Sequence, residues 1–317
     1  MRVSVPETTL RKNPEAQVPR LPAWALSLAG RTQETDSRAL PGLEVSERGG
    51  HRLVSLRVPD CRDIPSEVFA ARVQDAYRRL YREQHGFHPI RLWNFIPDIA
   101  RPSGEGLNRY MVFNDARRAA LLETHTSEQN LRASLCAATA VGHADDMLVL
   151  HCLASKRSST PLENPRQIPS WRYSPTWGPT PPSFARATAT PLESNEYDTL
   201  LIAGTASILG ENSLHPKDPD KQIREILDNL ASLIGAAAGE KASTALRRLT
   251  HLRVYRHTQI EEPRIREALA LQLEPIPEVA IEHCLATFCR PELLAEIEGC
   301  ARLGDLPDES GAATTRN

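Results

Sequence analysis

The chain has 317 residues, 40% of them hydrophobic and 25% charged, and a formal net charge of −2. This composition is typical of a globular protein with one large domain or two modest ones. The sequence has no apolar run of the roughly 18 residues that a membrane-spanning helix needs, and it lacks the basic excess typical of nucleic-acid-binding proteins. Of its 38 basic residues, 33 are arginines, whose planar guanidinium suits carboxylate recognition.

The six cysteines are scattered and form no C-x-x-C pair. The N-terminal residues show no apolar segment of the kind found in secretory signals. We therefore expect free thiols and a cytoplasmic location, because disulfides are rare in reducing compartments.

The first half of the chain predicts a leader over 1–48, partly disordered and rich in Pro, Ser, Gly and charge, with an edge strand as the alternative. An α/β unit is then predicted over 49–158. One helix of this unit carries an apolar face, because its large apolar residues recur at helical spacing. They are Phe69, Val73, Ala76, Tyr77 and Leu80. The expected elements are strands at 51–58 and 89–99, helices at 65–84 and 107–125, and strands near 132–142 and 147–154.

A proline-rich segment follows over 159–190, with seven prolines between residues 159 and 188. So many prolines exclude a helix interior or a central strand. One interpretation is a flexible linker. Four aromatic residues and three arginines favour instead an ordered loop at a functional site. They are Trp171, Tyr173, Trp177, Phe184, Arg166, Arg172 and Arg186.

A second α/β unit is predicted over 191–305, with a tail over 306–317. The stretch 218–239 predicts an amphipathic helix that ends at a glycine. Around it, we expect strands at 197–206, 251–257, 279–288 and 293–299 and a second helix at 261–273. This order of strands and helices predicts an α+β layer fold.

No nucleotide-binding or nucleophile-elbow motif is present. The polar groups His85 with His88, and His143 with Asp145 and Asp146, are more typical of exposed turns than of metal ligands, so we expect no metal.

In the last predicted strand, Glu296 and Glu298 share one face because strand side chains alternate. A solvated strand face is the simple interpretation. The alternative is a general acid, because the apolar neighbours would desolvate a carboxyl and raise its pKa. Cys289, seven residues earlier, is an ordinary core thiol on spacing alone.

Five blocks carry a resemblance to a known family. They are LWNFIPDI (92–99), GLNRYMVFNDARRAAL (106–121), ENPRQIPSWRYSPTWGPTPPSFARAT (163–188), LIAGTASILG (201–210) with the following HP, and CRPELLAEIEG (289–299). In this order they resemble the chorismatases, which hydrolyse the enolpyruvyl ether of chorismate. The C-terminal unit also resembles the YjgF-like reactive-intermediate deaminases.

The resemblance implies two YjgF-like (chorismate mutase-like) units, each with helices on a mixed sheet, and an active site in a cleft. It implies that Glu296 is the general acid and that Cys289 lines the pocket. It also implies that Arg186, Tyr173 and Arg172 face the substrate carboxylates, helped by the backbone at Gly204 and Thr205. Trp177 stands where relatives commonly have tyrosine.

For this family we expect no cofactor, chorismate as the small-molecule partner, and a monomer, with a trimer as the alternative. The expected products are pyruvate and 3-hydroxybenzoate, the alternatives being 4-hydroxybenzoate and a dihydroxycyclohexadiene carboxylate. Two other functions stay open: a deaminase-like imine or enamine hydrolase, and a non-catalytic binding protein of the same fold. The first lacks its usual arginine in VAIEHCLATF (279–288).

Overall fold

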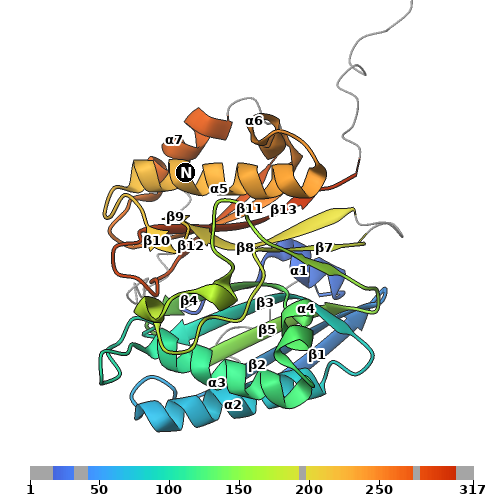
Figure 1. The fold of residues 1–317 in the computed structure, drawn as a ribbon, viewed down its shortest axis with the longest axis vertical. Coiled ribbons are helices and arrows are strands. Elements are labelled where there is room, and N and C mark those ends of the chain that lie inside the picture. Colours follow the sequence, from blue (N-terminus) through green and yellow to red (C-terminus); the bar gives the residue numbers. More distant parts are fainter. Residues whose placement is uncertain (1–16, 32–41, 193–197, 274–278, 305–317) are drawn as a thin grey trace, which may run out of the picture.

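The computed structural model describes residues 17–31, 42–192, 198–273 and 279–304. Within these ranges two β-sheets face each other and helices cover their outer faces, which makes four layers (Figure 1). The predicted α+β class, with two similar units of helices on mixed sheets, is confirmed. The predicted tail and most of the predicted leader lie outside the described residues.

The N-terminal unit has a five-stranded sheet in the order β1-β2-β5-β3-β4. Strands β3 and β4 run parallel, and the other neighbours run antiparallel. Helix α2 buries the apolar face that its spacing predicts. The elements are β1 (Gly42–Arg48), β2 (His51–Val58), α2 (Ser66–Arg82), β3 (His88–Pro97), α3 (Arg109–Thr124), α4 (Glu128–Ser134), β4 (Ala137–His143) and β5 (Leu148–Ser155).

The C-terminal unit has a six-stranded sheet in the order β12-β11-β13-β8-β7-β6, with β11 and β12 parallel. Its long helix α5 begins at the capping side chain of Asp218 and ends at Gly239, which has the left-handed backbone conformation. The elements are β6 (Thr160–Leu162), β7 (Ala187–Thr190), β8 (Thr199–Ala206), the hairpin β9 (Ile208–Leu209) and β10 (Asn212–Ser213), α5 (Pro219–Ala238), α6 (Ala242–Ala245), β11 (Leu249–Arg256), α7 (Glu262–Leu273), β12 (Ala280–Leu285) and β13 (Ala295–Arg302).

The two units repeat one topology. In each, two antiparallel strands are followed by a helix, a strand, a helix and two more strands, and the last strand inserts into the middle of the sheet. The order β1-β2-β5-β3-β4 therefore corresponds to β7-β8-β13-β11-β12, to which the second unit adds β6 at its edge.

Four elements, β1, β6, β7 and α4, differ from the predicted boundaries. Strand β1 lies in the range assigned to the leader, and β6 and β7 lie in the range assigned to the proline-rich loop. Strand β1 lies at the edge of its sheet, and every residue of it is half-buried or exposed. Helix α4 occupies part of the strand expected near 132–142, because the Ser127 side chain caps residues that have no strong apolar period.

A third apolar cluster fills the space between the two sheets. It includes Trp93 and Phe95 of β3, Tyr255 of β11, and residues of the segment around α1 (Ala23–Leu28). Since both sheets bury their inner faces here, the two units are held in one fixed arrangement. The loops at one end of this junction therefore have a rigid base.

Candidate active site

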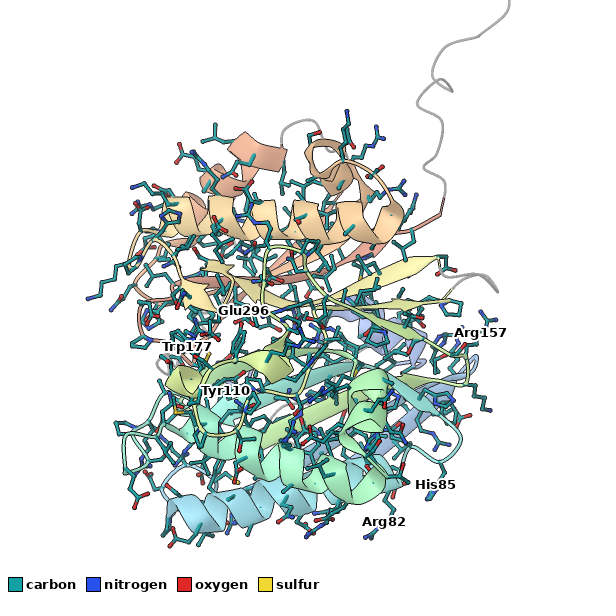
Figure 2. All side chains as sticks on the ribbon, in the orientation of Figure 1. Arg82, His85, Tyr110, Arg157, Trp177 and Glu296 are labelled. Atoms are coloured by element: carbon teal, nitrogen blue, oxygen red, sulfur yellow. The ribbon has the colours of Figure 1, made fainter. Side chains whose placement is uncertain are left out.

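A cavity of about 190 Å³ lies between the two units at one end of the junction. Its walls come from α3, β8, β13, the proline-rich loop, and the loop between β12 and β13. Figure 2 shows Glu296, Trp177 and Tyr110 at this end, whereas Arg157 lies at the opposite end. Five of the predicted site residues line the cavity, namely Glu296, Cys289, Arg186, Tyr173 and Gly204.

Glu296 extends from β13, with only 8% of its surface exposed. Among the described residues, no donor lies within hydrogen-bond distance of its carboxyl. Burial raises its pKa to about 8, the negative charge of Glu298 adds to the rise, and Arg91 and Arg186 oppose it. Glu296 is therefore a protonated carboxylic acid at neutral pH that faces a cavity.

The backbone at Gly204 makes room for this carboxyl. The register between β8 and β13 shifts so that Ala203 and Gly204 both lie opposite Glu298, a bulge that turns Gly204 toward the cavity. A Cβ at position 204 would overlap Oε1 of Glu296. A glycine is therefore required for the acid to adopt this position.

The predicted anion contacts at Gly204 and Thr205 are not formed as expected. The Gly204 N–H donates to Oγ1 of Thr139 at 3.0 Å, so it already has a partner. Thr205 pairs across the sheet with Ile297, which packs on the helical side, and its hydroxyl donates to the Ala203 carbonyl. Thr205 therefore lies outside the cavity lining, because cross-strand partners share one face.

The raised pKa of Glu296 predicts a pH-dependent stability. Between pH 4.5 and 8, Glu296 keeps a proton in the native protein that it has lost in the unfolded chain, so its contribution to stability falls as the pH rises, by up to about 1.4 kcal/mol per pH unit. We expect Glu296→Gln to match the wild type near pH 4.5 and to exceed it increasingly toward pH 8. Urea unfolding at several pH values measures this, and parallel curves for the two proteins would contradict it.

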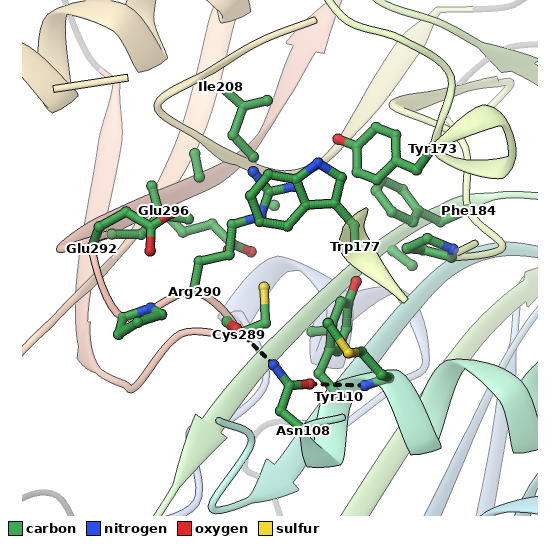
Figure 3. Close-up of a pocket in the computed structure, with 18 of the residues that line it drawn as sticks. Asn108, Tyr110, Tyr173, Trp177, Phe184, Ile208, Cys289, Arg290, Glu292 and Glu296 are labelled. Carbon is green, nitrogen blue, oxygen red and sulfur yellow. Dashed lines mark hydrogen bonds between the residues drawn. The ribbon is translucent and has the colours of Figure 1, made fainter. Parts of the chain in front are cut away.

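Cys289 lies in the loop before β13 and is partly buried. Figure 3 shows its thiol directed into the space between Tyr110, Trp177 and Arg290. Its carbonyl accepts a hydrogen bond from Nδ2 of Asn108 at 3.4 Å. Burial raises the pKa of the thiol to about 12, so Cys289 presents a neutral S–H to the cavity rather than a thiolate.

Arg186 and Tyr173 form a pair in the proline-rich loop. Nη2 of Arg186 donates to the Tyr173 hydroxyl at 2.6 Å and to the Ile168 carbonyl at 3.1 Å, and the arginine is only 4% exposed. Arg172 is exposed and does not line the cavity, because the short turn Ser170–Arg172 directs it to solvent while Tyr173 faces inward. The expected role of Arg172 in carboxylate binding has no support from this geometry.

Arg290 and Trp177 form a second pair that the sequence analysis did not assign to substrate contacts. The Arg290 guanidinium lies 3.2 Å from the centroid of the Trp177 ring, and Nη1 donates to the Glu211 carbonyl and to Oγ of Ser213. Figure 3 shows the two side chains stacked at the cavity wall. In the sequence, only its position directly after Cys289 indicates that Arg290 belongs to the site.

Arg117 of α3 is a third arginine at the cavity, and no pattern in the sequence indicates its role there. It is 3% exposed, and it makes no hydrogen bond or ion pair with any described residue. Its guanidinium carbon lies 5.3 Å from the centroid of the Tyr77 ring. A buried and unpaired guanidinium is costly, and an anion bound in the cavity would offset this cost.

The described ranges contain no group of three or more metal-ligating side chains. In the same ranges, no helix has the length and apolar character needed to cross a membrane.

Comparisons with known proteins agree on one family. A family model described as chorismatase FkbO/Hyg5-like, N-terminal, matches residues 29–154. A 3-hydroxybenzoate synthase of Streptomyces hygroscopicus is 30% identical over 84% of this chain and 78% of its own length. A chorismatase of the same species is 33% identical over 66% of this chain and 60% of its own length. A chorismatase crystal structure matches 85% of this chain and 80% of that chain, with a TM-score of 0.68 and 25% identity. The chain therefore belongs to the chorismatase family of enzymes.

Proposed function

We propose that the protein converts chorismate into pyruvate and 3-hydroxybenzoate, with Glu296 as the general acid. The observation that carries this proposal is a carboxylic acid with a pKa of about 8 that faces a cavity lined by three arginines. A general acid works best when its pKa lies near the working pH. The names of the relatives, a 3-hydroxybenzoate synthase and chorismatases, support the same substrate and product.

In the proposed reaction, Glu296 gives its proton to the methylene carbon of the enolpyruvyl group. The ionised carboxylate then stabilises the oxocarbenium ion that forms. Water adds to this cation, and the resulting hemiketal breaks its bond to the ring oxygen, which releases pyruvate and a dihydroxycyclohexadiene carboxylate. Loss of one water from this ring gives hydroxybenzoate, so that the overall reaction consumes no water.

The three arginines at the cavity match the two carboxylates of chorismate. Among the described residues, Arg117 has no hydrogen-bond or ion-pair partner, whereas Arg186 and Arg290 are held in place by Tyr173 and Trp177. Guanidinium groups bind carboxylates through paired hydrogen bonds. The six free thiols favour a reducing compartment such as the cytoplasm.

Incubation of the purified protein with chorismate tests the function. We expect stoichiometric pyruvate, detected with lactate dehydrogenase, and a hydroxybenzoate identified by chromatography and ultraviolet absorbance. Binding without turnover would favour the non-catalytic binding protein. Turnover of 2-imino acids in place of chorismate would favour the deaminase-like hydrolase.

We propose that Cys289 directs the ring chemistry, because its neutral thiol shares the cavity with Glu296. For Cys289→Ala, we expect the share of 3-hydroxybenzoate among the products to fall and that of the dihydroxycyclohexadiene carboxylate to rise, while pyruvate release continues. Cys289→Ser is the matched control for side-chain volume. Chromatography of the products measures the ratio, and an unchanged mixture in Cys289→Ala would remove Cys289 from the mechanism.

A further inference from the structure

The two glutamates on the inner face of β13 have opposite surroundings. Glu296 meets the cavity without a donor, whereas Glu298, two residues further along, is 2% exposed and accepts three hydrogen bonds. The donors are Nη2 of Arg91 at 2.8 Å, Nε1 of Trp93 at 2.9 Å and Oγ1 of Thr139 at 2.6 Å. A site made of donors alone suits an ionised carboxylate. Glu298 is therefore a buried anion beside the proton donor.

The same cluster is connected to the wall behind Glu296. Oγ1 of Thr139 donates to Glu298, and it accepts hydrogen bonds from Nη2 of Arg91 at 2.6 Å and from the Gly204 N–H at 3.0 Å. Gly204 is the residue against which the Glu296 carboxyl lies. The hydrogen-bond chain therefore runs from Glu298 through Thr139 to the backbone that positions the acid.

We propose that Glu298, held by Arg91, Trp93 and Thr139, is a positioning residue for Glu296: its fixed negative charge keeps the acid protonated, and its link through Thr139 holds the Gly204 backbone behind it. This inference rests on the proposed function of the cavity. It assigns a role to Glu298 and its three donors, none of which lines the cavity. The charge of Glu298 acts on Glu296 more strongly than the opposing charge of Arg91 does.

Other ionisable groups also surround Glu296, and none of them supplies this negative charge from the buried side. Besides Glu298 they are Arg91 on β3, Tyr110 and Arg117 on α3, Tyr173 and Arg186 in the proline-rich loop, and Cys289, Arg290 and Glu292 in the loop before β13. The arginines lower the proton affinity of a neighbouring acid, and the neutral Tyr and Cys groups leave it unchanged. Glu292 is the one other anion among them, and it lies on the loop rather than behind the acid.

The test is the pH dependence of kcat/KM for pyruvate release from chorismate in Glu298→Gln. This variant removes the anion and leaves the buried Arg91 cation beside Glu296. We expect the alkaline midpoint to move down by at least about one pH unit, so that the rate falls about fivefold or more at pH 8 and about tenfold or more well above it. At a pH well below the new midpoint, we expect activity within a few-fold of the wild type.

Two further variants separate this role from a structural one. Arg91→Met combined with Glu298→Gln removes both charges, and we expect its midpoint to lie between those of Glu298→Gln and the wild type. Glu282→Gln is the control, because it breaks a different ion pair of the same sheet, in which Nη2 of Arg253 donates to Glu282 at 2.7 Å. We expect the midpoint of this variant to equal that of the wild type. A uniform loss of activity in Glu298→Gln, with no shift in the midpoint, would overturn the proposal.

A second readout does not need turnover. The titration of the Glu296 carboxyl can be followed by ¹³C NMR of the labelled protein, with Glu296→Gln to assign the signal. If the wild type does not act on chorismate, the proposed function fails, whereas a lower Glu296 midpoint in Glu298→Gln would still support the role of Glu298. Equal midpoints in the two proteins would overturn that role whatever the substrate is.

Discussion

Glu296→Gln should lower the rate of pyruvate release from chorismate by at least about a hundredfold, within the usual contribution of a general acid. Glutamine fills the same space beside Gly204, but it has no proton to give to the enolpyruvyl carbon. Its amide also cannot become an anion beside the developing cation. Both the protonation and the electrostatic stabilisation are therefore lost in one substitution.

The measurement is initial velocity under saturating chorismate, with Glu282→Gln as a control that removes a carboxyl from the same sheet outside the cavity. We expect the loss in kcat rather than in KM, because the interaction is made in the transition state. The wild-type kcat/KM should also decline above pH 8, where Glu296 ionises. A glutamine variant with activity near that of the wild type would exclude Glu296 as the acid.

Much of the fold could be predicted because its central elements carry strong local patterns. The apolar face of α2 and the alternating residues of β2 are visible in the sequence, and the structure buries them. Helix α4 was not predicted, and an edge strand was only the alternative to a leader at β1, because both elements lie at the edge of a unit, where few side chains are buried. Pairing with β2 and capping by Ser127 determine their structure.

The site could be predicted only in part, because two of its properties arise when the units pack together. The spacing of Glu296 and Glu298 correctly placed both on one face, but it could not tell which of them would meet Arg91, Trp93 and Thr139. Those partners come from the other unit, between 159 and 207 residues away along the chain. The bulge that turns Gly204 inward and Thr205 outward likewise depends on the register with β13.

The sequence also does not show which arginines reach the cavity. In the proline-rich loop, Arg172 and Arg186 looked alike in the sequence, and only the turn at Ser170–Arg172 sends one to solvent. Arg117 belongs to a helix in which two arginines are adjacent, and a helix pattern alone does not say which of them is buried. The structure exposes more of Arg118, which pairs with Glu128, and buries Arg117 at the cavity.

Arg117→Met should lower kcat/KM for chorismate by about ten- to a hundredfold, chiefly through KM, because a charged hydrogen bond to a substrate carboxylate contributes about 1.5–3 kcal/mol. Arg118→Met is the matched control on the same helix, and we expect its KM to stay close to that of the wild type. Lysine at 117 should not restore binding fully, because an ammonium lacks the planar pair of donors.

The stability of Arg117→Met separates substrate binding from a structural role. Since Arg117 has no hydrogen-bonding partner among the described residues, its removal should leave the free energy of unfolding unchanged or raise it, because an unpaired buried cation is replaced by an apolar side chain. If Arg117 instead stabilised the fold, Arg117→Met would lower the free energy of unfolding. A stable variant with poor binding of chorismate therefore identifies Arg117 as a carboxylate site, whereas a stable variant with an unchanged KM would exclude it.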